Sequence, residues 1–376
     1  MSTKGLKILN FNSGFMPDKG GVATYSWELT KNLARSAKVE KVLVIAFNVS
    51  ARGIERVADN YTIIRYLRTN FWLMGLKILW YSYKYREFDV IHATNLFPVG
   101  FWSMLGARLL GKKYYVTIYG TEVLTNLASP LTFRLKRQVM KSAAKVFCIS
   151  RYTCQHTLRK YSLSANNFTV VYPGVSTSFT KKFDLTLKQT LGYGNDDFIV
   201  LTIGQLVVRK GMDDLIRAIS LISDKKVKLL IVGRGVELNN LQSLVAELGL
   251  LDRVKFAGKV PEVESYYNFA DVFCLTSRDE KESGDIEGFG LVLTEAQFRG
   301  IPVIGTNSGG IPEAMLDGQT GFIVPQRNSE AIAADILLLR ENIALRKKMS
   351  LAAKEFVVSN LSWPKQVDCH LAVYQE

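Results

Sequence analysis

The sequence predicts an α/β protein of two doubly wound domains, each with a mostly parallel sheet. Three observations support this fold class. The chain has 376 residues, which is long for a single compact core. Short apolar runs of strand length alternate with helical stretches along most of it, a pattern typical of parallel sheets. Glycine turns repeatedly separate a strand from the helix that follows, which allows a ligand to approach the backbone closely.

The amino-terminal half opens on a strand at Leu6–Phe11, which leads through a Gly20-Gly21 turn to a helical run from Tyr25 to Ala34. Further strand candidates alternate with helices. The last of them, Val170–Val175, precedes a polar segment at 176–197 that we expect to be a linker. The intermediate strand candidates are residues 41–46, 61–65, 90–93, 114–118 and 146–150.

Residues 71–86 are unusually rich in aromatic and basic side chains. Such a helix can lie at a lipid interface, with its rings at headgroup level and Lys77, Lys84 and Arg86 on phosphates. It can equally be a core helix whose aromatic face packs on the sheet. Both interpretations stay open from the sequence.

The carboxy-terminal half begins with a strand at Phe198–Gly204, and Arg209-Lys210-Gly211 follows at a turn. Two adjacent cations at a glycine turn suit a diphosphate, because Arg offers a bidentate fork and Lys a point charge. Two more strand-to-turn units, at 229–235 and 254–261, precede a strand at 272–276.

Two carboxylates, Glu287 and Glu295, bracket a Gly-Phe-Gly turn that opens a helix at 291–298. A strand, a glycine turn and a helix start form an anion site, because free N–H groups and the helix dipole point into one place. A phosphate held beside two carboxylates fits a nucleotide-sugar, since each carboxylate accepts hydrogen bonds from hydroxyl pairs. Residues 301–313 repeat the order of strand, glycine turn and helix start, and residues 317–325 close with a turn and a strand.

These motifs resemble the carboxy-terminal signature of the retaining glycosyltransferases of family 4, which share the two-domain GT-B fold. The signature is Glu, seven residues, Glu, then a Pro-Val-Ile strand, a Gly-Gly turn with Pro-Glu and a Gly-x-Thr-Gly turn. All parts are present in order, and the likeness spans nearly the whole chain, most weakly at 50–90. It implies two Rossmann-like domains facing a central cleft. An acceptor-binding domain would span residues 1–180, joined by a carboxy-terminal helix at about 360–376, and a nucleotide-sugar-binding domain would span residues 190–358.

The resemblance also implies roles for individual residues. Arg209 and Lys210 would neutralise the leaving diphosphate, Glu287 would hold hydroxyls of the donor sugar, and Glu295 would accept bonds from the ribose. We therefore expect Glu287, Arg209 and Lys210 to be catalytic. The donor-binding set is expected to be Gly20, Gly21, Gly288, Phe289, Gly290, Leu291, Glu295, Arg234 and Val260. The acceptor side is expected to hold His92, Glu122 and Tyr119, the last standing where many relatives have His.

Composition and charge limit the partners. Net charge is +14, and residues 1–190 hold 28 Lys plus Arg against 9 Asp plus Glu, whereas the rest hold 20 against 25. A basic half suits nucleic acid or an anionic membrane surface. We expect no nucleic acid, because no RRM, KH or zinc pattern is present. Scattered cysteines argue for a reducing compartment and against structural zinc, and neither a signal peptide nor a transmembrane run is expected.

We expect a metal-independent, retaining hexosyltransferase with no cofactor besides its nucleotide diphosphate sugar. The sequence lacks an Asp-x-Asp motif. The loop at 284–290 resembles that of some mannosyltransferases, which favours GDP-mannose while leaving UDP-hexoses open. The expected acceptor is a lipid-linked saccharide of polysaccharide or lipopolysaccharide biosynthesis, with the protein peripheral on the cytoplasmic face of the cell membrane. The alternatives are a soluble transferase that makes a small glycoside and a non-catalytic GT-B scaffold.

Overall fold

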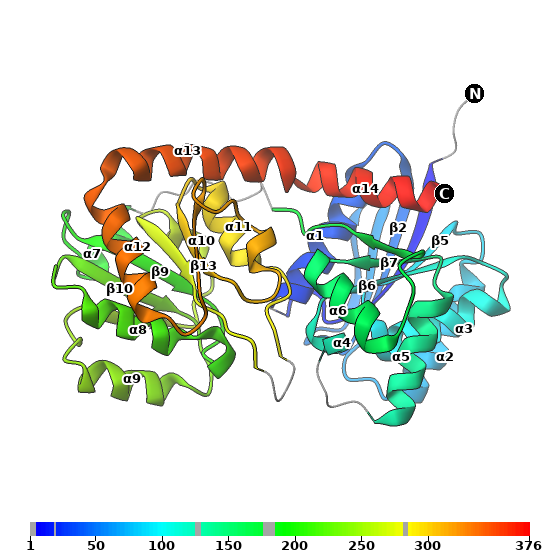
Figure 1. Ribbon diagram of the computed structural model, residues 1–376. Coiled ribbons are helices and arrows are strands. Elements are labelled where there is room, and N and C mark those ends of the chain that lie inside the picture. The colour runs from blue at the N-terminus through cyan, green and yellow to red at the C-terminus, as the bar shows by residue number, and fades with distance from the viewer. Residues whose placement is uncertain (1–4, 19, 125–128, 176–184, 281–284) are drawn as a thin grey trace. The chain divides into compact units, whose positions relative to one another are not determined.

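The computed structural model describes residues 5–18, 20–124, 129–175, 185–280 and 285–376. The chain divides into two compact units, one of residues 1–174 and 363–376 and the other of residues 175–281 and 285–362. Each unit has its own sheet with helices packed on it (Figure 1). This confirms the predicted α/β class with two doubly wound sheets.

The first unit is organised around an eight-stranded sheet in the order β3-β4-β2-β1-β5-β6-β7-β8. Neighbouring strands are parallel except for the antiparallel pair β3 and β4. The central strands are nearly continuous apolar runs because both of their faces are covered; Ile8, Leu9 and Phe11 of β1 are fully buried. The strands are β1 (Leu6–Ser13), β2 (Val39–Phe47), β3 (Gly53–Ala58), β4 (Tyr61–Arg65), β5 (Val90–Ala93), β6 (Tyr114–Ile118), β7 (Lys145–Cys148) and β8 (Phe168–Val170).

Helices connect these strands, and several begin at a polar cap. Asn70, Ser129 and Ser150 each accept a hydrogen bond from a backbone N–H in the first turn of the helix that follows. The helices are α1 (Gly21–Arg35), α2 (Phe71–Lys84), α3 (Phe101–Leu109), α4 (Thr121–Leu124), α5 (Pro130–Ser142) and α6 (Arg151–Tyr161), with a π-helical turn, η1 (Leu96–Gly100), before α3.

The two edge strands of this sheet, β3 and β8, were not predicted correctly from the sequence. No strand was expected at β3, where every residue is exposed, so the buried alternation that identifies a strand is missing. The strand expected at Val170–Val175 was placed too late, since β8 ends at Val170. Pro173 lies in the segment that was expected to be a strand and lacks the N–H that a sheet ladder needs.

Helix α2 packs on one side as a core helix, whereas the lipid-interface interpretation of its other side stays a prediction. One side packs against α3, and Gly75 is needed there because a Cβ would lie 2.3 Å from the Trp102 ring. The opposite side is exposed and carries large apolar side chains, among them Trp72 and Trp80. The buried residues of α2 are Met74, Gly75, Ile78, Tyr81 and Ser82.

Helix α14 (Trp363–Gln375) belongs to the first unit. The Tyr374 hydroxyl lies 2.7 Å from Nδ1 of His92 in β5, and the Tyr25 hydroxyl lies 3.3 Å from Nε2 of His370. Since Nδ1 of His370 bonds to the Gln366 carbonyl at 2.8 Å, Nε2 accepts from Tyr25. Burial lowers the pKa of His370 to about 4 and lowers the pKa of His92, so both rings are neutral at neutral pH.

The second unit has a six-stranded, fully parallel sheet in the order β11-β10-β9-β12-β13-β14. Its core lies between the sheet and the helices; Val200, Leu229 and Ile304 from three strands are fully buried in it. The strands are β9 (Phe198–Ile203), β10 (Val227–Val232), β11 (Val254–Gly258), β12 (Val272–Leu275), β13 (Val303–Thr306) and β14 (Gly321–Val324).

Two expectations for the second unit need correction. The helix start expected after the Gly309-Gly310 turn is only a three-residue 3₁₀ turn, η3 (Ile311–Glu313), because the chain turns again at Gly318 before a helix can extend. Of the expected linker, residues 176–184 lie outside the described residues, and the remainder includes a short helix, α7. The helices are α7 (Leu185–Thr190), α8 (Met212–Leu221), α9 (Leu238–Glu247), α10 (Glu264–Tyr267), α11 (Leu291–Phe298), α12 (Ser329–Glu341) and α13 (Ile343–Asn360), with a 3₁₀ turn, η2 (Val208–Lys210).

Among the helices that the structure describes, none is both long enough and apolar enough to cross a bilayer.

Candidate functional site

The expected catalytic residues lie at the carboxyl edge of the second sheet. Strands β10 and β11 lie on one side of β9, whereas β12, β13 and β14 lie on the other, so the winding reverses between β9 and β12. Open α/β sheets bind ligands at such a switch point, beyond the carboxyl ends of the strands. Arg209 and Lys210 follow β9, and Glu287 follows β12. The fold therefore brings both loops to the place where a ligand is expected.

Arg209, Lys210 and Glu287 meet through one carboxylate oxygen. Oε2 of Glu287 accepts hydrogen bonds from Nη1 of Arg209 at 2.8 Å and from Nζ of Lys210 at 2.5 Å. The Ser277 hydroxyl donates to the same oxygen at 3.2 Å. Arg209 also pairs with Asp285, with 3.1 Å between Nε and Oδ2. The two cations thus share a cluster with two carboxylates.

The charge of Glu287 is fixed by this cluster. Burial opposes ionisation of its carboxyl group, but Lys210 and Arg209 outweigh burial and lower its pKa to about 2. Glu287 is therefore a carboxylate at any physiological pH. It can accept hydrogen bonds but cannot act as a general acid.

The cation turn is held in place by the end of β12. Gly211 has φ +58, and a Cβ there would lie 2.1 Å from the Thr276 carbonyl oxygen. The Thr276 hydroxyl donates to the Gly211 carbonyl at 2.8 Å. A side chain at Gly211 would push the turn away from β12, so this glycine sets the positions of Arg209 and Lys210 relative to Glu287.

The Gly309-Gly310 turn supports the loop of Glu287 from the other side. The backbone N–H of Gly310 donates to the Glu287 carbonyl at 2.9 Å. A Cβ on Gly309 would lie 2.0 Å from that carbonyl oxygen, and one on Gly310 would lie 2.2 Å from the Gly288 carbonyl oxygen. The Gly-Gly motif is therefore needed for close packing of two backbones.

Helix α11 begins at this loop without a side-chain cap. Gly290, the N-cap residue of α11, has φ +92 and offers no side chain to the N–H groups of the first turn. The first N–H groups of a helix have no partner within the helix and favour anions. The amino end of α11 therefore offers amides that suit a phosphate.

Glu295, on α11, has a different environment from Glu287. The Tyr267 hydroxyl donates to Oε2 of Glu295 at 2.9 Å, and the Arg299 guanidinium lies 4.8 Å from the centre of the Tyr267 ring. Burial raises the pKa of Glu295 to about 7, which the Tyr267 bond and Arg299 only partly offset. The two glutamates therefore differ in charge near neutral pH, one always ionised and one titrating.

The other expected donor-binding residues of this unit lie at the same sheet edge. Arg234 follows β10 and is exposed, and Val260 follows β11 and is half-buried. The Phe289 ring is buried, so this residue can meet a ligand only through its backbone. Gly288 and Leu291 flank it in the loop and at the helix start. Gly284, at the start of the mannosyltransferase-like loop, lies outside the described residues.

In the first unit, Gly20 and Gly21 lie at the start of α1, after β1. Gly20 has φ +152, and α1 also lacks a side-chain cap. Three acceptor-side residues were expected here, His92, Tyr119 and Glu122. His92 is fully buried and both ring nitrogens have partners, Nε2 with the Thr117 hydroxyl at 2.8 Å and Nδ1 with Tyr374. The ring of His92 thus serves the packing of α14.

Tyr119 and Glu122 are also held internally. The Tyr119 side chain is buried, with its hydroxyl 3.2 Å from that of Ser26. Oε1 of Glu122 accepts a hydrogen bond from the Tyr119 backbone N–H at 2.5 Å, and burial raises the pKa of Glu122. These contacts fix the loop after β6.

Three contributors to the site were missed from the sequence. Ser277 bonds to Glu287, and Tyr267 with Arg299 surrounds Glu295. Ser277 lies two residues after the end of β12, and this position was the only available signal. Tyr267 precedes β12 and Arg299 follows α11, and neither position has a motif that distinguishes it.

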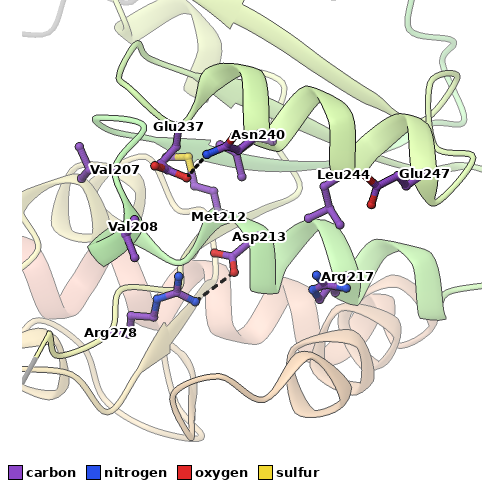
Figure 2. Close-up of a pocket in the computed structure, with 11 residues that line it drawn as sticks. Val207, Val208, Met212, Asp213, Arg217, Glu237, Asn240, Leu244, Glu247 and Arg278 are labelled. Carbon is purple, nitrogen blue, oxygen red and sulfur yellow. Dashed lines mark hydrogen bonds and ion pairs between the residues drawn. The ribbon is translucent and has the colours of Figure 1, made fainter.

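A cavity of about 290 Å³ lies beside η2, between α8 and α9. Figure 2 shows Arg278 paired with Asp213 among its lining residues, with 3.1 Å between Nη1 and Oδ2. Glu287, Lys210 and Glu295 are not part of the lining. The cavity is therefore separate from the cluster at the switch point. Within the described ranges, no group of three or more His, Cys, Asp or Glu residues is arranged to hold a metal ion.

Comparison with known proteins extends over both units. A family model described as "Glycosyl transferases group 1" matches residues 184–356, and one described as "Glycosyltransferase Family 4" matches residues 19–179. The GDP-mannose-dependent alpha-(1-6)-phosphatidylinositol monomannoside mannosyltransferase of Mycolicibacterium smegmatis is 30% identical over 272 residues, 71% of each chain. The N-acetyl-alpha-D-glucosaminyl L-malate synthase of Bacillus anthracis is 28% identical over 292 residues, 77% of this chain and 74% of that one. The crystal structure of Anabaena HepE in complex with UDP matches with a TM-score of 0.81 at 20% identity, covering 98% of this chain and 100% of that one.

Proposed function

The chain belongs to glycosyltransferase family 4 and has the GT-B fold, and on this premise we propose that it moves mannose from GDP-mannose to the hydroxyl of a lipid-linked saccharide. The observation that carries the proposal is the meeting of Arg209, Lys210 and Glu287 beside the uncapped start of α11. Cations, a fixed carboxylate and open amides at one switch point match the parts of a nucleotide diphosphate sugar.

The diphosphate is bound by Arg209, Lys210 and the first amides of α11. Arg209 presents a fork and Lys210 a point charge, and both lie on a turn whose position is fixed by Gly211. Negative charge grows on the leaving diphosphate as the glycosidic bond breaks. Hydrogen-bond donors and cations that are already positioned where this charge develops commonly account for a large share of the rate enhancement.

The two glutamates hold the sugars of the donor. Oε2 of Glu287 serves Arg209, Lys210 and Ser277, and Oε1 is the oxygen that we assign to a hydroxyl of the transferred hexose. Glu295 accepts bonds from the ribose hydroxyls when it is ionised. Gly20 and Gly21 stay predictions for contact with the donor phosphate or the acceptor.

Transfer proceeds with retention of the anomeric configuration. The acceptor hydroxyl attacks the anomeric carbon from the face that the nucleotide leaves, forming the new glycosidic C–O bond as the C–O bond to phosphate breaks. The proton of the acceptor hydroxyl passes to the leaving phosphate, and nucleoside diphosphate is released. Burial opposes ionisation of Glu287, but Lys210 and Arg209 lower its pKa to about 2, so it has no proton to give when the donor binds. The reaction requires no metal.

GDP-mannose is favoured over other donors by two similarities. The relative from Mycolicibacterium smegmatis is named for GDP-mannose dependence, and the loop at 284–290 is similar to that of mannosyltransferases. UDP-hexoses are the competing donors. They belong in any test because the HepE structure holds UDP.

A lipid-linked acceptor is favoured by the same relative and by charge. That relative is named for a phosphatidylinositol mannoside. In this chain, the excess of Lys and Arg lies in residues 1–190, with 28 against 9 acidic residues. A basic surface holds a protein at an anionic bilayer. The protein works peripherally on the cytoplasmic face of the cell membrane, in polysaccharide or lipopolysaccharide assembly.

A second candidate is a transferase that makes a small soluble glycoside. The relative from Bacillus anthracis, named an N-acetyl-alpha-D-glucosaminyl L-malate synthase, favours it. This candidate predicts turnover that does not respond to lipid.

The deciding experiment is a panel of GDP- and UDP-linked sugars, tested by calorimetric affinity and by slow donor hydrolysis without acceptor. We expect selective binding of GDP-mannose, unchanged by a metal chelator. Glu287→Ala should lower the rate of hydrolysis by about a hundredfold, and Glu330→Ala, an exposed glutamate on α12, is the matched control. Selective binding of a UDP-sugar would overturn the donor assignment, and binding of none would overturn the transferase function.

A further inference from the structure

Helix α2 carries an exposed apolar stripe that its packing does not use. Trp72 is 70% exposed, Leu76 66%, Trp80 53% and Tyr83 62%. Their spacing of four, four and three residues places them on one side of the helix. The opposite side is closed by α3, since a Cβ on Gly106 would meet the Ser82 hydroxyl at 2.8 Å. We call Trp72, Leu73, Leu76, Trp80 and Tyr83 the α2 face.

Exposed cations outnumber carboxylates near the α2 face, although Glu87 directly follows Arg86 and is also exposed. Helix α2 contains no acidic residue. Lys84 and Arg86 are exposed at its carboxyl end, where Nζ of Lys84 lies 4.7 Å from the centre of the Trp80 ring and Cζ of Arg86 lies 4.9 Å from that of Tyr83. Cations over aromatic faces are stabilised there and still have N–H groups for an anion. Lys77 differs, because it is half-buried with Nζ 4.0 Å over the Tyr66 ring.

Helix α3, which packs on α2, also ends in an exposed leucine. Leu109, one turn beyond Gly106, is 77% exposed, and the exposed Arg108 and Lys113 flank it in sequence. The carboxyl ends of the two helices therefore present leucine, tryptophan and tyrosine with four cations, Lys84, Arg86, Arg108 and Lys113. Tryptophan and tyrosine with nearby Lys and Arg are the composition of a helix at a lipid interface.

We propose that the α2 face is the surface by which this protein lies on an anionic bilayer, with Trp72, Leu76 and Trp80 in the acyl boundary. Lys84 and Arg86 then contact lipid phosphates. This inference rests on the proposed membrane placement and assigns it to particular residues. Tryptophan, tyrosine and arginine are also common at protein–protein interfaces, but lysine is depleted there, and Lys84 and Lys113 can pair with lipid phosphates.

The test is flotation of the full chain with vesicles of phosphatidylcholine, alone or mixed with phosphatidylglycerol. Wild type should partition onto the mixed vesicles, and the triple variant Trp72→Ser, Leu76→Ser, Trp80→Ser should lose at least about tenfold in partitioning. The matched control is Leu221→Ser, Val236→Ser, Leu351→Ser, three exposed apolar residues of the second unit, and it should bind as wild type does.

Charge is tested separately. Lys84→Glu with Arg86→Glu should remove the preference for anionic vesicles, and Lys347→Glu with Lys348→Glu, an exposed pair on α13, should retain it. The preference should weaken in high salt, because exposed charges are screened. Thermal melting of each variant checks folding, and quenching of tryptophan fluorescence by brominated lipid in wild type, reduced in Trp80→Phe, gives a second readout.

Outcomes for this surface and for the transferase function can be separated. Vesicle binding without nucleotide binding would support the α2 face while the proposed function fails. Vesicle binding that survives the triple substitution, or wild type that does not bind, would overturn the inference. If the triple substitution converts a dimer to a monomer in analytical ultracentrifugation but leaves vesicle binding unchanged, a second copy of the chain covers this face instead.

Discussion

The Tyr267 hydroxyl donates to the Glu295 carboxylate at 2.9 Å, beneath the Arg299 guanidinium. Tyr267 lies before β12 and Glu295 lies within α11, so the bond links two elements on either side of the switch-point loop. Burial raises the pKa of the Glu295 carboxyl group to about 7, and the hydrogen bond from Tyr267 partly offsets this by favouring the ionised form. The charge of one proposed ribose-binding group is therefore tuned by a tyrosine.

Donor affinity should depend on pH through Glu295. The carboxylate accepts bonds from both ribose hydroxyls and the protonated acid is a poorer acceptor, so affinity should rise with pH through about 7 and level off above it. We expect roughly a tenfold change between about pH 6 and pH 8, measured by calorimetry. Glu295→Gln should bind weakly with a flat profile; an unchanged slope in that variant would assign the titration to another group.

Removing the tyrosine hydroxyl should move this profile. Tyr267→Phe deletes the bond that favours the carboxylate, so the pKa of Glu295 should rise and the midpoint of nucleotide binding should shift to higher pH. Tyr266→Phe, at the neighbouring position, serves as the control. A midpoint that stays in place would mean that Tyr267 has only a packing role.

Substitution of Glu295 and of Glu287 should impair different steps, nucleotide binding and turnover respectively. Glu295→Ala should chiefly weaken nucleotide binding, whereas Glu287→Ala should chiefly lower turnover, by about a hundredfold, because it removes a fixed charge next to Arg209 and Lys210. Steady-state kinetics with separate nucleotide affinities would distinguish them. Unchanged kinetics in both variants would show that the site lies elsewhere.

Gly310→Ala should reduce activity without contacting substrate. Its φ of −87 suits alanine, but the new Cβ would lie 2.2 Å from the Gly288 carbonyl oxygen and displace the loop of Glu287. We expect at least about a tenfold loss of kcat/KM together with a lower Tm. Gly194→Ala, whose Cβ would have its nearest neighbour at 3.6 Å, should be neutral.

The first unit should lose stability in mild acid. His370 is buried neutral with its pKa lowered from 6.5 to about 4, so the unfolded state binds a proton first. Stability is complete above about pH 6.5 and falls until about pH 4, by roughly 3 kcal/mol for this group. Denaturant titrations at several pH values would measure it. His370→Gln should show a smaller loss over that range, and an equal loss would assign the effect to other groups, His92 among them.

The sequence was sufficient to predict elements with continuous apolar runs between clear turns. Strands β4, β5 and β6 and helix α11 have the bounds that their sequences indicated. Strands β5 and β6 are buried at every residue, and this leaves a continuous apolar run between clear turns. Strand β3 is exposed throughout and has no such pattern. Helix α2 has one buried face and one exposed apolar face, so composition alone could not assign it.

The sequence motifs predicted which residues belong to the site, but not the hydrogen bonds between them. The motifs predicted that Arg209, Lys210 and Glu287 belong to one site. The sequence did not predict that Arg209 and Lys210 share one oxygen of Glu287, which lies 78 and 77 positions further along the chain. Such pairing depends on strand order, which a linear pattern does not contain. Tyr267 and Ser277 are unremarkable in sequence for the same reason, since only their neighbours in space give them a role.

Helix α14 affects how the protein can be synthesised. Tyr25 and His92 lie early in the chain, yet their partners His370 and Tyr374 are translated only after the whole second unit. Domains usually fold in order as they leave the ribosome. Here the second unit can be completed before the first, and Tyr25 and His92 of the nascent first unit lack these partners until α14 has emerged.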